Sequence, residues 1–153
     1  MRLGLFGGSF NPIHRCHLSI ARSARQLLQL DRVLFIPTGD PPHKQPGTLA
    51  AASHRHRMVQ LAIQDTPEFA LTDIEIQRSG KSYSIDTVRA IQQEYGPDTV
   101  LFFIIGLDAF LDLPSWKEAD TLLKSCHFVV ISRPSTSFQA MAAIPLFRDV
   151  PQT

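Results

Sequence analysis

The sequence predicts an α/β fold: a doubly wound, Rossmann-like and mostly parallel sheet with helices on both faces. Two observations predict it. Short apolar runs rich in β-branched and aromatic residues alternate along the chain with helix-period segments, and strands covered on both faces of a parallel sheet have this composition. The length of 153 residues is that of one domain, so we expect a single unit over residues 1–153.

Four short apolar runs are the expected strands, and they are Leu3–Phe6, Val33–Ile36, Val100–Ile105 and Phe128–Ile131. The segment Phe69–Gln77 alternates apolar and polar residues instead, which favours an edge strand or an extended connection. The segment Thr38–Thr48 is rich in proline and glycine and is expected to be a loop.

Apolar residues at helical spacing between these runs predict four helices. In chain order the helices carry Leu18, Ala21, Leu27 and Leu28; then Met58, Leu61 and Ala62; then Val88 and Ile91; and last Leu122 and Leu123. We expect Ser53 to cap the second helix and either Asp86 or Ser84 to cap the third, because such side chains accept hydrogen bonds from the free N–H groups of a helix start. Strands and helices in this alternation form a parallel sheet through right-handed crossovers.

Composition limits the classes of partner. The formal net charge of +1 does not supply the basic face that grips nucleic acid. The two cysteines, Cys16 and Cys126, form no disulfide framework and fit a reducing compartment. No apolar run approaches the roughly 20 residues that a membrane helix needs, and the N-terminus lacks the apolar region of a signal peptide. We expect a cytoplasmic protein without nucleic-acid or membrane partners; whether it forms a homo-oligomer stays open.

The most informative segment is Gly7–His17, which reads G-G-S-F-N-P-I-H-R-C-H and follows the first expected strand. Two glycines in a turn allow a ligand to approach the backbone, and Pro12 suits a turn or a first helical position. A helix that begins near Ile13 places His14 and His17 on one face of its first turn, where N–H groups and the helix dipole favour an anion. This pattern indicates a phosphate site. Zinc needs at least three protein ligands, so no metal site is expected from this pair.

Three further polar segments also follow expected strands: Thr38–Lys44, Gly106–Asp108 and Arg133 with Pro134. In doubly wound sheets, ligands bind at the carboxyl ends of the strands, so we expect all four segments to face one edge. Asp108 could accept hydrogen bonds from a ribose diol or cap a helix, and both roles stay open.

These motifs resemble the nucleotidylyltransferase superfamily, in which the first strand leads into a Gly-rich turn and a His-x-Gly-His motif. The run G-G-S-F-N-P-I-H is similar in particular to the bacterial nicotinate mononucleotide adenylyltransferases. The likeness extends to Pro41–Lys44, Ser82–Thr87, Ile105–Ala109, Trp116 and Ile131–Pro134, and so covers Met1 to about Pro134. It implies adenylyl transfer from ATP to nicotinate mononucleotide, which yields nicotinate adenine dinucleotide and pyrophosphate.

The resemblance also implies site residues. The implied catalytic residues are His14, His17 and Lys44; the implied ATP contacts are Gly7, Gly8, Ser9, Phe10, His17, Gly106, Asp108 and Arg133. The implied mononucleotide contacts are Asn11, His43, Lys44, Tyr83, Ser84 and Trp116. The Phe10 side chain by itself is most simply a core residue. We expect Mg²⁺ to enter with ATP, held mainly by pyrophosphate oxygens and water. No general base is expected, because the attacking phosphate oxygen is already anionic.

The chain departs from the family pattern at two places. Cys16 stands where the His-x-Gly-His motif has glycine, and the late Ser-Ser-Thr-x-x-Arg segment of the family does not appear before Thr153. We therefore expect impaired turnover from this 153-residue chain. Two alternatives stay open: the same reaction on phosphopantetheine or nicotinamide mononucleotide, and a nucleotide-binding module without catalysis.

Overall fold

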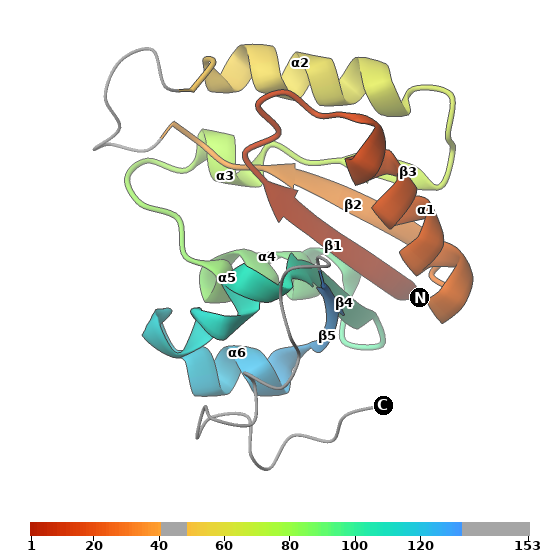
Figure 1. The fold of residues 1–153 in the computed structure, drawn as a ribbon. Helices are drawn as coiled ribbons and strands as arrows, with labels where there is room; N and C mark the ends of the chain where they lie inside the picture. Colours follow the sequence, from red (N-terminus) through yellow and green to blue (C-terminus); the bar gives the residue numbers. More distant parts are fainter. Residues whose placement is uncertain (41–48, 133–153) are drawn as a thin grey trace.

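A five-stranded sheet forms the centre of the computed structural model, which describes residues 1–40 and 49–132. The strands are β1 (Arg2–Gly8), β2 (Arg32–Pro37), β3 (Phe69–Leu71), β4 (Val100–Gly106) and β5 (His127–Ile131). Their order across the sheet is β3-β2-β1-β4-β5, and every neighbouring pair is parallel (Figure 1). The predicted fold class is confirmed. The strand order reverses between β1 and β4, which is where doubly wound sheets bind their ligands.

Helices cover both faces of the sheet (Figure 1). They are α1 (Arg15–Leu28), α2 (Ala52–Ile63), α3 (Ile74–Gln77), α4 (Ser84–Tyr95), α5 (Leu107–Leu111) and α6 (Ala119–Ser125), with a short 3-10 helix, η1 (Leu113–Ser115). Alternate residues of one strand pack into two cores. Leu3 and Leu5 lie in the core with α4, α5 and α6, whereas Phe6 lies in the core with α1 and α2. Burial on both faces explains why the strands are continuous apolar runs.

The extended conformation expected for Phe69–Gln77 is wrong beyond Leu71. Residues Ile74–Gln77 form α3 instead. The carbonyl oxygen of Asp73 accepts hydrogen bonds from the N–H groups of Ile76 and Gln77, both at 2.9 Å. The N–H of Ile74 donates to Oγ1 of Thr72 at 3.3 Å. The polar residues around the two isoleucines therefore support one helical turn rather than a strand.

The caps expected for the second and third helices are also wrong. Helix α2 begins at Ala52, whose N–H donates to a carboxylate oxygen of Asp40 at 3.0 Å, so its first N–H is satisfied from 12 residues away. Helix α4 begins at Ser84, with Tyr83 as the N-cap, and the Asp86 carboxylate pairs with Lys117.

The buried face of the first helix differs from the prediction only at Leu27, because Ala21 is buried and Leu18 and Leu28 pack against the same core. Leu27 of α1 is 82% exposed. Helix α2 buries Arg55, Val59 and Ile63, whereas Met58, Leu61 and Ala62 were expected on its apolar face. The prediction followed apolar residues alone and so missed this face, because the face includes the charged Arg55. No helix in the described parts of the chain is long and apolar enough to cross a membrane.

Candidate active site

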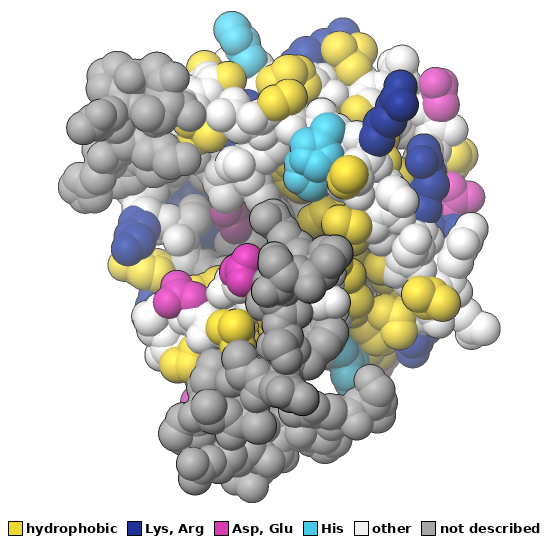
Figure 2. All heavy atoms as spheres, in the orientation of Figure 1, with side chains coloured by type: hydrophobic (Ala, Val, Ile, Leu, Met, Phe, Trp, Pro, Cys, Tyr) yellow, Lys and Arg dark blue, Asp and Glu magenta, His cyan; other side chains and the backbone are white. Residues whose placement is uncertain are grey.

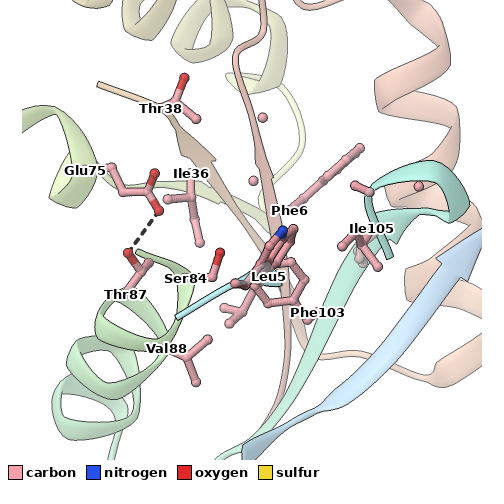
Figure 3. A pocket seen from close by; sticks show the side chains of 16 residues that line it. Leu5, Phe6, Ile36, Thr38, Glu75, Ser84, Thr87, Val88, Phe103 and Ile105 are labelled. Carbon is pink, nitrogen blue, oxygen red and sulfur yellow. Dashed lines mark hydrogen bonds between the residues drawn. The ribbon is translucent and has the colours of Figure 1, made fainter. Parts of the chain in front are cut away.

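A pocket of about 230 Å³ opens at the carboxyl ends of β1, β2 and β4, next to the point where the strand order reverses. The ends of the three strands and the first turn of α4 line it (Figure 3). Trp116 also belongs to the lining. The hydroxyl and carboxyl side chains in the lining are those of Thr38, Glu75, Ser84 and Thr87. A mainly apolar pocket with a few converging polar groups is typical of a small-molecule site.

The glycines of the Gly-rich segment lie in a strand, not in the turn expected for them. Gly7 and Gly8 end β1, pair with Ile36 and Pro37 of β2, and have no positive φ. Both line the pocket. A Cβ added to Gly7 would meet only the carbonyl oxygen of Ile36, at 3.8 Å. Packing within the fold therefore does not require glycine at position 7. The lack of a side chain leaves the strand backbone open on the pocket side.

The left-handed conformation in this segment belongs to Phe10, with φ of 46°. A bulky residue takes this conformation only when its surroundings hold it there. The Phe10 side chain is 1% exposed, and its ring centroid lies 5.6 Å from that of Phe6, 5.8 Å from that of Phe35 and 5.1 Å from that of His17. The prediction that Phe10 is a core residue is confirmed.

His14 and His17 meet at the start of α1. The helix begins at Arg15, slightly later than expected, with His14 as the N-cap. The two imidazole rings stack with 3.8 Å between centroids and 28° between planes, so the predicted shared face is confirmed. His14 is exposed and His17 is half-buried. Histidine side chains are visible on this side of the molecule near the start of α1 (Figure 2).

The surroundings of His17 determine its protonation. The backbone N–H of His14 donates to Nδ1 of His17 at 3.1 Å. Burial, and secondly the neighbouring His14, lower the pKa of His17 below its ordinary value of 6.5. The ring is therefore neutral at pH 7. Because Nδ1 accepts a hydrogen bond, the proton is on Nε2. His17 presents a neutral N–H donor beside a helix N-terminus.

Glu75 is a pocket residue that the sequence did not predict, and Thr87 lies in the predicted Ser82–Thr87 segment but was not among the predicted site residues. The Thr87 hydroxyl donates to a Glu75 carboxylate oxygen at 2.9 Å (Figure 3) and accepts from the Arg78 guanidinium at 3.0 Å. Burial raises the pKa of Glu75, although the hydrogen bond from Thr87 and the charge of Arg78 act against this rise. Glu75 lies on α3, the segment that was expected to be extended, so no sequence signal placed it at the pocket.

Trp116 and Ser84 face the pocket from different elements. Trp116 follows η1, is half-buried and packs its ring against Phe103, with 6.4 Å between centroids. Ser84 opens α4. Tyr83, the N-cap of α4, is not part of the lining; its exposed ring lies 4.8 Å from the Lys117 ammonium and 5.5 Å from that of Lys81.

The remaining predicted residues have varied positions. Gly106 is the N-cap of α5 and lines the pocket, and the exposed Asp108 follows within the first helical turn, so Asp108 is not an N-cap. Asn11 is exposed, and its side-chain oxygen accepts from the N–H of Ala50 at 3.1 Å. Exposed side chains are also found at two further positions: Ser9 and Cys16. Three predicted residues lie outside the described part of the chain: His43, Lys44 and Arg133.

Comparison with known proteins agrees with this architecture. The profile of the cytidylyltransferase-like family matches residues 5–150, and the chain belongs to this family. The "Probable nicotinate-nucleotide adenylyltransferase" of Citrifermentans bemidjiense is 49% identical over 148 residues, which are 95% of this chain and 68% of that protein. The protein of the same name from Geotalea daltonii is 46% identical over 99% of this chain and 67% of its own. The resemblance to the bacterial nicotinate mononucleotide adenylyltransferases is confirmed. The chain spans about two thirds of the length of these relatives.

A solved structure shows the same fold. Nicotinic acid mononucleotide adenylyltransferase of Plasmodium falciparum, in complex with NaAD, superposes with a TM-score of 0.70 at 22% identity. The superposition covers 91% of this chain and 78% of the other chain.

Proposed function

We propose that this chain transfers the adenylyl group of ATP to nicotinate mononucleotide, forming nicotinate adenine dinucleotide and pyrophosphate. The observation that carries the proposal is a juxtaposition at one sheet edge: the stacked His14 and His17 pair opens α1 directly after β1, and the Trp116 pocket lies at the ends of β1 and β4. Relatives that are named for this reaction and are up to 49% identical support it.

The start of α1 suits the reacting phosphates. An N-terminal helix dipole favours anions, and the Nε2–H of His17 adds a donor whose tautomer is fixed by the bond from His14. A mononucleotide phosphate that attacks the α-phosphorus in line is already anionic. The site therefore needs positioned donors for the charge on the transferring group rather than a general base. In this proposal Lys44 adds a point charge to phosphate oxygens.

The pocket suits the mononucleotide. Its half-buried Trp116 offers an aromatic face to a pyridine ring, and the start of α4 at Ser84 offers backbone N–H groups to the ring carboxylate. The proposal keeps Asn11, Tyr83 and His43 as further mononucleotide contacts.

We assign the adenosine and α-phosphate of ATP to the strand ends. Gly7 and Gly8 line the pocket and are the proposed backbone contacts of the nucleotide; a Cβ at Gly7 would meet only the Ile36 carbonyl oxygen, whereas a Cβ at Gly8 would touch the Phe10 ring at 3.5 Å. Asp108 at the start of α5 offers its exposed carboxylate to the ribose. The remaining proposed ATP contacts are Ser9, Phe10, Gly106 and Arg133.

We propose Mg²⁺ as the ion that accompanies ATP. No three His, Cys, Asp or Glu side chains within residues 1–40 and 49–132 gather in a way that could hold a metal ion. Mg²⁺ binds mostly through substrate phosphates and water with one or two protein carboxylates, and this is the mode that we propose. Bound there, the ion would neutralise charge on the departing pyrophosphate.

A coupled pyrophosphate assay tests the proposal. The chain is incubated with ATP, Mg²⁺ and one acceptor at a time: nicotinate mononucleotide, nicotinamide mononucleotide or phosphopantetheine. We expect pyrophosphate release to have its highest kcat/KM with nicotinate mononucleotide. Calorimetric binding of ATP without pyrophosphate release from any acceptor would instead identify a non-catalytic nucleotide-binding module.

A further inference from the structure

Arg55 is a fully buried cation next to the proposed active site. Its side chain on α2 is 0% exposed, whereas arginine side chains are usually exposed to solvent. The nearest carboxylate, on Asp40, lies 3.3 Å from the guanidinium and is itself 65% exposed. Burying a charge is expensive unless hydrogen bonds compensate for the lost water. The partners of this guanidinium therefore indicate what it is for.

Those partners are mostly backbone carbonyl oxygens from three separate segments. Nε donates to Ala50 at 2.7 Å, before α2. Nη1 donates to Ser9 at 2.8 Å, after β1, and to Thr38 at 2.9 Å, after β2. Nη2 donates to Gly39 at 3.4 Å and to the Asp40 carboxylate at 3.3 Å. Every N–H donor of the guanidinium thus has an acceptor.

Two other bonds join the same segments without any charge. The N–H of Thr38 donates to the carbonyl of Gly8 at 2.9 Å, and the N–H of Ala50 donates to the Asn11 side chain at 3.1 Å. Among the described hydrogen bonds, only the one from Arg55 reaches the Ser9 carbonyl. Ser9 precedes the strained Phe10, and the turn from Ser9 leads directly into His14.

We propose that Arg55 is a positioning residue for adenylyl transfer. Arg55 holds the Ser9 carbonyl next to the end of β2. It thereby determines the position of His14 and His17 relative to the pocket. It touches no substrate. This inference rests on the proposed function, because its kinetic consequence is defined for that reaction.

The test compares Arg55→Lys and Arg55→Gln with the control Arg57→Gln. Lysine keeps the charge but not the fork of donors, and glutamine removes the charge that must be buried. Arg57 lies two residues along α2, is exposed, and bonds only the Gln60 side chain, at 2.7 Å, among its described contacts. Both Arg55 variants should lower kcat about 10- to 100-fold, because misplacement by about 1 Å can cost 100-fold in rate. KM for both substrates should stay within about threefold, and Arg57→Gln should match the parent chain.

A second readout does not depend on activity. Hydrogen–deuterium exchange over residues 7–14 should be at least about tenfold faster in the Arg55 variants, while exchange in α4 and α6 should stay unchanged. If the parent chain releases no pyrophosphate, the proposed function fails, and the exchange experiment still decides whether Arg55 holds the turn.

Three outcomes would overturn the inference. One is a folded Arg55→Lys or Arg55→Gln variant with the parent kcat. Another is unchanged exchange over residues 7–14 in a folded variant. The third is failure of both variants to fold, since Arg55 would then be required for the whole fold rather than for the position of the turn.

Discussion

The imidazole of His17 combines three properties that a transition-state donor needs. It is half-buried, it is held neutral, and its Nδ1 is occupied by the His14 N–H at 3.1 Å. A donor fixed before the reaction stabilises developing charge without reorganising. We therefore expect substitution of His17 to lower the rate of the proposed reaction more than substitution of the other described residues.

We expect His17→Ala to lower kcat about 100- to 1000-fold, the usual effect of losing one positioned donor to a transition-state oxyanion. His17→Gln, which keeps an N–H near the position of Nε2, should retain more of the rate. His54→Ala is the control, because His54 is exposed on α2. Steady-state kinetics and thermal melts check this, and near-parent turnover in His17→Ala would remove His17 from the reaction.

The protonation of His17 yields a separate prediction. Its pKa is lowered, so its NMR titration should have a midpoint below 6.5. The unfolded state then takes up protons before the folded state does as the pH falls. The stability from this group is therefore complete above pH 6.5 and is lost as the pH drops through the folded pKa. His14→Ala should raise the midpoint, because it removes the neighbouring imidazole. A His17 midpoint at or above the ordinary value would contradict the described surroundings.

Trp116 is the proposed contact whose loss should affect one substrate and not the other. Trp116→Ala should raise KM for nicotinate mononucleotide about 10- to 100-fold, as expected for a stacked ring worth roughly 1–3 kcal/mol. KM for ATP should change little. Because Trp116 also packs against Phe103, melting temperatures are measured alongside. An equal rise of KM for both substrates would mark Trp116 as a packing residue only.

Among the elements, the contact of the β2 loop with α3 allows the least space. A Cβ at Gly39 would lie 2.6 Å from the backbone carbonyl oxygen of Glu75, so one of the two segments must move. We expect Gly39→Ala to destabilise the fold by about 1–3 kcal/mol, the usual cost of overpacking. Gly106→Ala is the matched control for stability, because a Cβ there would meet no atom within 4 Å. Denaturant unfolding measures both, and equal stability of the two variants would contradict this packing.

Sequence patterns predicted the elements best where local residues determine them. The inner strands are covered on both sides, so their apolar runs needed no knowledge of neighbours. The prediction failed where a distant group decides the structure. Asp40 caps α2 at Ala52, and the buried Arg55 is satisfied by carbonyls that the chain brings together only on folding. Helical periodicity predicts that such an arginine is exposed.

At the scale of the whole molecule, the parallel sheet brings the site together. All five strands point the same way, so the segments after β1, β2 and β4 emerge at one edge. This convergence was predictable from the order of the strands alone. The polar side of the pocket was not, because Glu75 and Thr87 meet there through the turn of α3.

Adenylyl transfer by this chain can be followed directly at the α-phosphorus of ATP. The chain is incubated with nicotinate mononucleotide, Mg²⁺ and ATP labelled at that phosphorus, and the products are separated by chromatography. Adenylyl transfer predicts that the label moves into nicotinate adenine dinucleotide in an amount equal to the pyrophosphate released, and that His17→Ala slows this transfer. Label that stays in ATP, or appears in ADP or AMP without dinucleotide, would contradict the account.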